Sequence, residues 1–341
     1  MSEEEVENVE VENQEEQVPP EPKNILKPEQ IAAGLSQVSK IHDGSSYAYV
    51  NLNLEEKELE ELGDHLRLYQ HLRFLNLSKN QLKDINEITY LPYLLTLNAS
   101  ENQIQDIGFF ESNTEALQFT QLVNLSKNKI QTLISMIQPR MTRLILNENE
   151  IASAMNFQCG SKLKILELRK NKLTDCKGLG NLYMLEELYL AENEITTIED
   201  LVNMTNLTKL HLRGNKLTTL ENQIAISNSY LKYINLRDNQ IADLKGIQNL
   251  CSLSLLETFG MQGNPIVEEK GDGFKTDFLI QTNEWIKIKK LNKEEVTAED
   301  HENANNERET RKKEEEEARL EKERLALEKN DEEEVQPAED E

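Results

Sequence analysis

The chain has 341 residues and a formal net charge of −25, from 38 basic and 63 acidic residues. Its two ends carry −22 of that charge, because residues 1–22 hold nine Glu and no Lys or Arg, and residues 294–341 are net −13. A chain this acidic repels nucleic acids and anionic membranes, so we expect neither as a partner.

The first segment, residues 1–22, predicts an acidic disordered tail, because it is rich in Glu and poor in large apolar side chains. A secretory signal or a transit peptide would be apolar or basic here. No apolar run in the chain approaches the roughly 20 residues that a membrane helix needs. We therefore expect a protein that stays inside the cell, in a reducing compartment.

Residues 23–48 precede a repeated pattern and are predicted to cap its N-terminal end. Ile31, Leu35 and Val38 have the spacing of one face of an amphipathic helix. Without such a cap, the first repeat would expose its core leucines to water.

A motif of apolar residues and one Asn then repeats through residues 49–269, with periods of 21 to 26 residues that cluster at 22. A well-formed copy has its key residues at Leu72, Leu75, Leu77, Asn80 and Leu82. The Asn recurs as Asn102, Asn128, Asn149, Asn171, Asn193, Asn215, Asn239 and Asn264. The first copy has Lys57 at this position instead. The pattern L-x-x-L-x-L-x-x-N-x-L resembles that of leucine-rich repeats.

The physical meaning of each part of the motif follows from its spacing. The x-L-x-L-x stretch predicts a strand whose two leucines face the core and whose intervening residue faces outward. Apolar residues spaced by three after the motif predict a short 3₁₀ or helical segment on the opposite wall. The buried Asn must satisfy backbone groups at the turn. We therefore predict an α/β solenoid of about ten leucine-rich repeats, with a curved parallel sheet on its concave side and a cap at each end.

The repeat pattern breaks at Glu269, and residues 270–292 predict a C-terminal cap. The apolar residues of this segment can cover the last repeat: Phe274, Phe278, Leu279, Trp285, Ile286, Ile288 and Leu291.

Beyond the cap, residues 293–330 combine Glu, Lys and Arg with Ala and Leu, and predict a charged helix. Pairs four residues apart, such as Glu309 with Lys313, support that helix. Its leucines make no sustained heptad, so a coiled coil is not favoured. We expect a solvated extension, with a helix that docks on a partner as the alternative, and a second acidic disordered tail over residues 331–341.

No arrangement typical of an enzyme is present. Gly178 and Gly180 lack the rest of any phosphate-binding fingerprint, and the five His show no metal-ligand spacing. Cys159, Cys176 and Cys251 are an odd number with wide gaps, which favours neither a disulfide framework nor a zinc site. We expect no catalytic residue, cofactor, metal or small-molecule substrate.

The outward strand positions form the candidate protein-binding surface. In the first half of the array they are small and neutral, whereas the second half gathers Arg and Tyr, the residue types that anchor interfaces. The candidate residues are Arg169, Tyr189, Lys209, His211, Arg213, Tyr233 and Arg237. An ordinary solvated face is the alternative, because exposed strand positions must be polar in any case.

The repeat length and two stretches of sequence resemble narrower groups within the leucine-rich-repeat proteins. The 22-residue repeat is similar to the SDS22-like class, and LNKEEVTAED resembles the cap of that class, with Asn292 in place of the usual Asp. The stretch GLSQVSKIHDGSSYAYVNLNLEEKELEEL, followed by LRLYQHLRFLNLSKNQLKDI, resembles a family of leucine-rich-repeat proteins of the radial spokes of motile cilia. The Ala-Tyr-Val at 48–50 is its most specific part, and the likeness spans about residues 30–266.

The resemblance implies a non-catalytic structural scaffold of the ciliary axoneme, located in the cilium or flagellum, with radial spoke proteins as partners. It brings no catalytic residue to transfer. The alternative is a regulatory or adaptor subunit, because other members of the SDS22-like class bind phosphatase catalytic subunits, dynein heavy chains or splicing proteins.

Overall fold

The structure is a computed structural model that describes residues 23–41, 44–112, 115–221, 230–282 and 288–334. The predicted tail at 1–22, residues 335–341 of the second tail, and the cap residues Trp285 and Ile286 lie outside the described residues.

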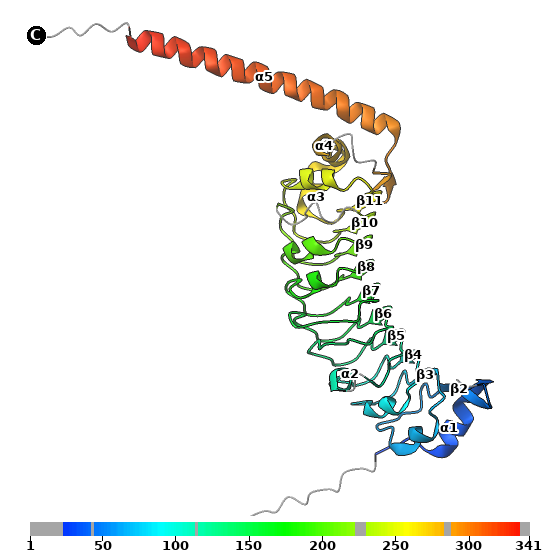
Figure 1. Ribbon diagram of the computed structural model, residues 1–341. Coiled ribbons are helices and arrows are strands. Elements are labelled where there is room, and N and C mark those ends of the chain that lie inside the picture. The colour runs from blue at the N-terminus through cyan, green and yellow to red at the C-terminus, as the bar shows by residue number, and fades with distance from the viewer. Residues whose placement is uncertain (1–22, 42–43, 113–114, 222–229, 283–287, 335–341) are drawn as a thin grey trace, which may run out of the picture.

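The strands form one open, 13-stranded sheet in which neighbours in sequence are neighbours in space (Figure 1). Pairing is parallel from β2 to β12 and antiparallel in the terminal pairs β1–β2 and β12–β13. The strands are β1 (Leu35–Lys40), β2 (Tyr47–Asn53), β3 (Phe74–Asn76), β4 (Thr96–Asn98), β5 (Leu122–Asn124), β6 (Arg143–Ile145), β7 (Ile165–Glu167), β8 (Glu187–Tyr189), β9 (Lys209–His211), β10 (Tyr233–Asn235), β11 (Thr258–Gly260), β12 (Lys290–Leu291) and β13 (Glu294–Glu295). The sheet lines the inner side of a curved array, and the predicted solenoid with a concave parallel sheet is confirmed.

Short helical segments connect the strands across the opposite wall, whereas α1 precedes the first strand and the long α5 follows the last one. The α-helices are α1 (Pro28–Gly34), α2 (Phe109–Ser112), α3 (Pro265–Lys270), α4 (Phe274–Gln281) and α5 (Ala298–Glu334). The 3₁₀ helices span Asp64–Leu68, Asn86–Tyr90, Leu179–Asn181, Glu199–Asn203, Ile247–Ser252 and Gly271–Gly273. The three-residue spacing of apolar side chains predicted such segments, since residues three apart share a face of a 3₁₀ helix.

The core is a continuous stack of leucines between the two walls. In β8 and the residue after it, Leu188 and Leu190 are fully buried, whereas Tyr189 between them faces outward. Leu188 is paired with Leu166 of β7 and Leu210 of β9, so equivalent leucines stack from repeat to repeat. The alternation along a strand thus separates the core from the concave surface.

The recurring Asn links each repeat to the one before it. The side-chain amide of Asn171 donates to the Leu168 carbonyl at 3.1 Å in its own repeat and to the Leu146 carbonyl at 3.0 Å in the preceding repeat. Its Oδ1 accepts the Ile151 N–H at 3.1 Å. The same bonds recur along the array, so the predicted role of this Asn at the turn is confirmed and extends to joining neighbouring repeats.

The first repeat, which lacks this Asn, is completed by a side chain from outside the repeats. The amide of Asn24 donates to the carbonyls of Lys57 and Glu58 at 3.1 and 3.0 Å. The backbone N–H of Lys57 donates to Oδ1 of Asn80 in the second repeat at 2.9 Å. The turn that Lys57 occupies is therefore held from both sides.

The N-terminal segment differs in part from the prediction. Ile31 lies on α1 and is fully buried, as a helical cap requires. The helical expectation is wrong for Leu35 and Val38, which belong to β1, and Val38 is exposed. Gly34 ends the helix against β2, where a Cβ would lie 2.3 Å from the Asn53 carbonyl oxygen. From there the chain pairs with the edge of β2, which would otherwise leave backbone groups unpaired.

At the other end, α4 and β12 lie over the last repeat. The rings of Phe259 in β11 and Phe278 in α4 are 5.2 Å apart between centroids, and both are buried. Asn292, which stands where the resemblance expects Asp, accepts the N–H groups of Met261 and Gln262 through Oδ1 at 2.6 and 2.9 Å. An amide oxygen therefore makes the contacts to the last repeat that a carboxylate would make.

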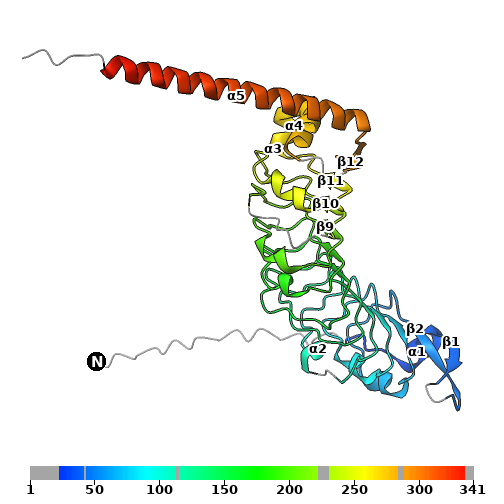
Figure 2. The same ribbon diagram turned by 45° about the horizontal axis from the view of Figure 1, so that its top comes forward.

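Helix α5 begins against α4 and then projects away from the array (Figures 1 and 2). The Arg308 guanidinium donates to the carbonyls of Leu279, Ile280 and Thr282 at 2.6 to 2.8 Å, and so satisfies the C-terminal end of α4. Arg311 forms an ion pair with Asp277 of α4 at 3.0 Å. The prediction of a charged helix over 293–330 is wrong at both ends. Glu294–Glu295 form β13, and the helix spans Ala298–Glu334, so residues 331–334 of the predicted disordered tail are helical.

Candidate functional site

The polar side chains at the outward positions of the first repeats form hydrogen bonds with one another. The amide of Asn76 donates to Oδ1 of Asn53 at 3.0 Å, and the amide of Asn98 donates to Oδ1 of Asn76 at 3.0 Å. The Ser78 hydroxyl also donates to Oδ1 of Asn76, at 2.8 Å. This part of the concave surface is a neutral polar ladder with its hydrogen-bonding groups largely used.

In the later repeats the concave surface becomes charged and aromatic. We call it the concave stripe: the outward side chains of β6 to β10 and of the residues after them, namely Arg143, Glu167, Arg169, Glu187, Tyr189, Lys209, His211, Arg213, Tyr233, Asn235, Arg237 and Asp238. All seven residues predicted from the sequence belong to it, because one-residue alternation puts them on the same side of the sheet.

A nearly buried carboxylate lies at the start of the stripe. Glu167 forms an ion pair with Arg143 at 2.6 Å, accepts the amide of Asn147 at 3.0 Å and has Arg169 at 3.9 Å. The Arg169 guanidinium also lies over the Tyr189 ring, 4.4 Å from its centroid. Burial of this Glu is tolerated because cations and an amide surround it.

Tyr189 and Lys209 share a second carboxylate. The Tyr189 hydroxyl donates to Glu187 at 2.5 Å, and Lys209 forms an ion pair with Glu187 at 3.0 Å. Burial and the hydrogen bond to Glu187 raise the pKa of Tyr189, so its hydroxyl stays protonated at neutral pH. Lys209 is therefore locally neutralised.

His211 lies between two tyrosines. Its ring centroid is 6.1 Å from that of Tyr189 and 6.2 Å from that of Tyr233. Burial, and then the nearby Arg169, Arg213 and other cations, lower the pKa of His211 to about 4. This histidine is therefore neutral at physiological pH.

Arg213 and Arg237, on adjacent repeats, differ in pairing. Arg213 forms an ion pair with Asp238 at 2.6 Å. The half-buried Arg237 guanidinium has no carboxylate or carbonyl partner among the described residues, and lies against Gly260, where a Cβ would come within 3.2 Å of its Nε. The two arginines, which look equivalent in the sequence, therefore offer a partner different charges.

Four buried side-chain N–H groups of the stripe have no hydrogen-bond partner among the described residues. They are Nε of Arg143, Arg169 and Arg237 and Nδ1 of His211. Buried polar groups are usually paired, so four unpaired donors within one stripe are unusual.

The sequence missed the acidic and amide members of the stripe, Glu167, Glu187, Asn235 and Asp238, and also Arg143. Arg143, Glu167, Glu187 and Asn235 occupy outward strand positions, so the strand register was the available signal for them. Asp238 lies in the turn after Arg237 at a positive φ, which the register does not predict. The prediction selected Arg and Tyr by residue type and passed over the groups that neutralise them. The binding role of the seven predicted residues stays a prediction.

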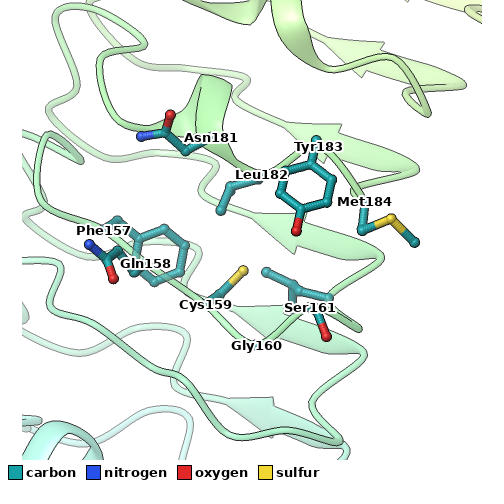
Figure 3. Close-up of a pocket in the computed structure, with 10 residues that line it drawn as sticks. Phe157, Gln158, Cys159, Gly160, Ser161, Asn181, Leu182, Tyr183 and Met184 are labelled. Atoms are coloured by element: carbon teal, nitrogen blue, oxygen red, sulfur yellow. The ribbon is translucent and has the colours of Figure 1, made fainter.

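A separate pocket lies on the flank of the array (Figure 3). It has a volume of about 290 Å³ and is lined by Phe157, Gln158, Cys159, Gly160, Ser161, Leu163, Asn181, Leu182, Tyr183 and Met184. Burial raises the pKa of the Cys159 thiol to about 11, so this Cys is a thiol and not a thiolate at neutral pH. None of these described lining residues carries a charge, and polar Gln158, Ser161 and Asn181 alternate with apolar ones, so the pocket is neutral and of mixed polarity.

An aromatic row lies at the strand-entry edge of the first repeats. His71 stacks on Tyr93 with 6.0 Å between centroids, Tyr93 contacts Phe119 at 5.9 Å, and the Arg140 guanidinium lies 4.7 Å from the Phe119 centroid. These rings line a notch of about 220 Å³ beside Lys40 and Arg73. The Arg73 guanidinium donates to the Lys40 carbonyl at 2.9 Å, which fixes one wall of this notch.

Within the part of the chain that the structure describes, no group of three or more His, Cys, Asp or Glu side chains is placed to hold a metal ion. None of the described helices has the length and apolar character needed to cross a membrane. Cys159 and Cys176 are both free cysteines, while the side chain of Cys251 lies outside the described ones.

Comparison with known proteins identifies the repeats. Family models described as leucine-rich repeats match residues 183–225, in two copies, and residues 70–85 and 227–251. Leucine-rich repeat-containing protein 23 of Bos taurus is 32% identical over 298 residues, which cover 80% of this chain and 78% of the bovine protein. The Mus musculus protein of the same name is 32% identical over 80% of this chain and 76% of its own length.

Solved structures show the same architecture. A leucine-rich-repeat protein of Leptospira interrogans superimposes with a TM-score of 0.55 at 24% identity, over 69% of this chain and 59% of that protein. A TLR13–ssRNA13 complex gives a TM-score of 0.54 at 22% identity, over 68% of this chain and 34% of that one. At this identity the likeness concerns the fold alone.

Proposed function

The chain belongs to the family of leucine-rich repeat-containing protein 23, and on this premise we propose that it is a non-catalytic structural component of the ciliary axoneme, associated with the radial spokes and needed for ciliary motility. At the coarser level it is a leucine-rich-repeat protein of the kind that serves as a scaffold for protein interactions. The ciliary part of the proposal rests on the family resemblance of the stretch around Ala48, Tyr49 and Val50.

The observation that carries the scaffold role is the pre-ordered concave surface. Each repeat is joined to its neighbour by parallel pairing and by the Asn bonds, as between Asn171 and Leu146. A surface that is already ordered loses little entropy when a large partner docks, so more of the contact energy remains as affinity. A structural element of a beating axoneme requires this property.

The concave stripe is the proposed docking surface within that scaffold. It combines Arg, Tyr and a neutral His on one side of β7 to β10. Arg and Tyr contribute strongly to binding when a partner removes them from water. The partly exposed guanidinium groups of Arg169 and Arg237 offer further donors to a partner.

The experiment is fractionation of cilia that contain a tagged copy of the protein. We expect the protein to stay with the microtubule doublets after detergent extraction, and to be released together with spoke proteins at high salt. Deletion of the gene should leave cilia assembled but beating abnormally, with density missing at one or more spokes. Normal spokes and normal motility after deletion would contradict the proposal and favour a regulatory or adaptor subunit that binds a phosphatase or a dynein chain.

A further inference from the structure

We propose, building on the docking role of the concave stripe, that its partner presents an acidic, extended peptide segment, and that a carboxylate of this segment pairs with the guanidinium of Arg237.

The first observation is the kind of group that lacks a partner. All four unpaired buried groups of the stripe are N–H donors, on Arg143, Arg169, His211 and Arg237. Carboxylates are acceptor-only groups, and their bonds to guanidinium are among the strongest in proteins. The Arg143 and Arg169 side chains stay partly exposed, so a carboxylate of a partner would bond to the outer nitrogens of these guanidinium groups and not to the buried Nε atoms.

The second observation shows which ring nitrogen of the neutral His211 carries the hydrogen. The Asn235 Oδ1 accepts the Arg237 backbone N–H at 3.1 Å, so the amide nitrogen of Asn235 faces His211 and lies 3.0 Å from its Nε2. Since that nitrogen donates, Nε2 must accept, and the hydrogen of the neutral ring is on Nδ1. The unpaired ring nitrogen is thus a donor, as in the three arginines.

The third observation is the charge of the stripe. Arg143, Lys209 and Arg213 each have a carboxylate partner, with separations of 2.6 to 3.0 Å. Arg169 reaches only Glu167, at 3.9 Å, which Arg143 already neutralises. Arg237 forms no ion pair among the described residues, although Asp238 and Glu268 line the same pocket. The stripe as defined holds five cationic side chains and three carboxylates, so it is locally positive on a chain of net charge −25. A local positive field on an acidic chain concentrates acidic ligands at this place.

The fourth observation concerns access and size. Nε of Arg237 is buried, whereas the side chain as a whole is partly exposed, so a carboxylate would bond to its terminal nitrogens. The strands β7 to β10 span roughly 14 Å at a spacing of about 4.8 Å. An extended segment of about four or five residues covers that length. Side chains two apart in an extended segment face the same way, so acidic residues at alternate positions would face the stripe.

The test uses the full chain and a fluorescein-labelled peptide in which Glu alternates with Gly, with the Gln-for-Glu peptide as the matched probe. Binding is followed by fluorescence anisotropy at low and high salt. We expect the Glu peptide to bind about tenfold more tightly than the Gln peptide, and the difference to shrink in high salt.

Three variants locate the site, with circular dichroism to check that each folds. Arg237→Gln should weaken binding of the Glu peptide by about tenfold. Arg213→Gln should have a smaller effect, because Asp238 already neutralises Arg213, and Lys216→Gln, outside the stripe and paired with Glu194, should have none. Equal binding of the two peptides, an unchanged affinity in Arg237→Gln, or equal losses in all three variants would overturn the proposal. Arg237-dependent binding of a single-stranded oligonucleotide without binding of the Glu peptide would also overturn it.

Failure of the peptide-binding inference can be told apart from failure of the proposed ciliary function, because the two are measured separately. Tagged wild-type and Arg237→Gln proteins are compared in isolated axonemes. If the peptide binds but the wild-type protein is absent from axonemes, the acidic partner lies elsewhere and only the ciliary role fails. If the wild-type protein is axonemal but no peptide binds, only the inference about partner chemistry fails.

Discussion

The amide nitrogen of Asn235 lies 3.0 Å from Nε2 of His211, across the boundary between β9 and β10. The same amide contacts the Tyr233 hydroxyl at 3.3 Å, so one buried side chain positions both neighbouring rings. Protonation of Nε2 would set two donors against each other. The concave stripe therefore depends on a histidine that remains neutral.

The first prediction concerns pH. The pKa of His211 is about 4 in the folded protein, against an ordinary value of 6.5, because of burial and surrounding cations. Between these two values the unfolded chain binds more protons than the folded one, so this residue lowers stability as the pH falls from 6.5 towards 4, and it has no effect above that window. The difference in melting temperature between the wild type and His211→Gln should accordingly be constant above pH 7 and move against the wild type on acidification. A difference that stays constant down to pH 4 would contradict this origin.

The second prediction concerns the Asn that links the repeats. Asn171→Ala should lower the free energy of unfolding by about 3 kcal/mol, because the Ile151 N–H and the Leu146 and Leu168 carbonyls lose a buried partner. Denaturant unfolding measures the loss. Asn203→Ala, at an exposed position, is the matched control and should stay within about 0.5 kcal/mol of the wild type.

The third prediction concerns the core register. Leu188→Asp or Leu210→Asp puts an unpaired charge into the leucine stack and should cost several kcal/mol. Repeats interact with their nearest neighbours, so hydrogen exchange should rise most in the repeats on either side. Leu320→Asp, at an exposed position of α5, is the control and should leave the melting temperature unchanged. Unchanged circular dichroism and melting in both core variants would refute the register.

The fourth prediction concerns the attachment of α5. Arg308→Ala removes the donors to three carbonyls at the end of α4 and should weaken the contact between the helices by about 2 kcal/mol. Hydrogen exchange should rise in Phe274–Gln281 and at the start of α5, while β3 to β10 remain protected. Arg319→Ala, far along the projecting part of α5, should change neither. Equal protection of α4 in both variants would show that Arg308 is not what holds α5.

The sequence by itself determined the solenoid, because its information is periodic. Each leucine and Asn of the motif occupies the same structural position in every repeat. The strand register, the core residues and the concave side therefore follow from spacing alone. The seven residues predicted for the concave stripe lie together for the same reason.

Only the tertiary structure decided which of those side chains form ion pairs and which do not. Spacing does not reveal that Asp238 pairs with Arg213 while Arg237 forms no ion pair among the described residues, because pairing across repeats depends on side-chain conformation and on the small Gly260 of the next strand. Nor does it reveal that the chain after Gly34 forms a strand. The helical spacing from Ile31 to Val38 is a local signal. The backbone groups at the edge of β2 need hydrogen-bond partners from a segment distant in sequence, and β1 supplies them at the expense of the local helical preference.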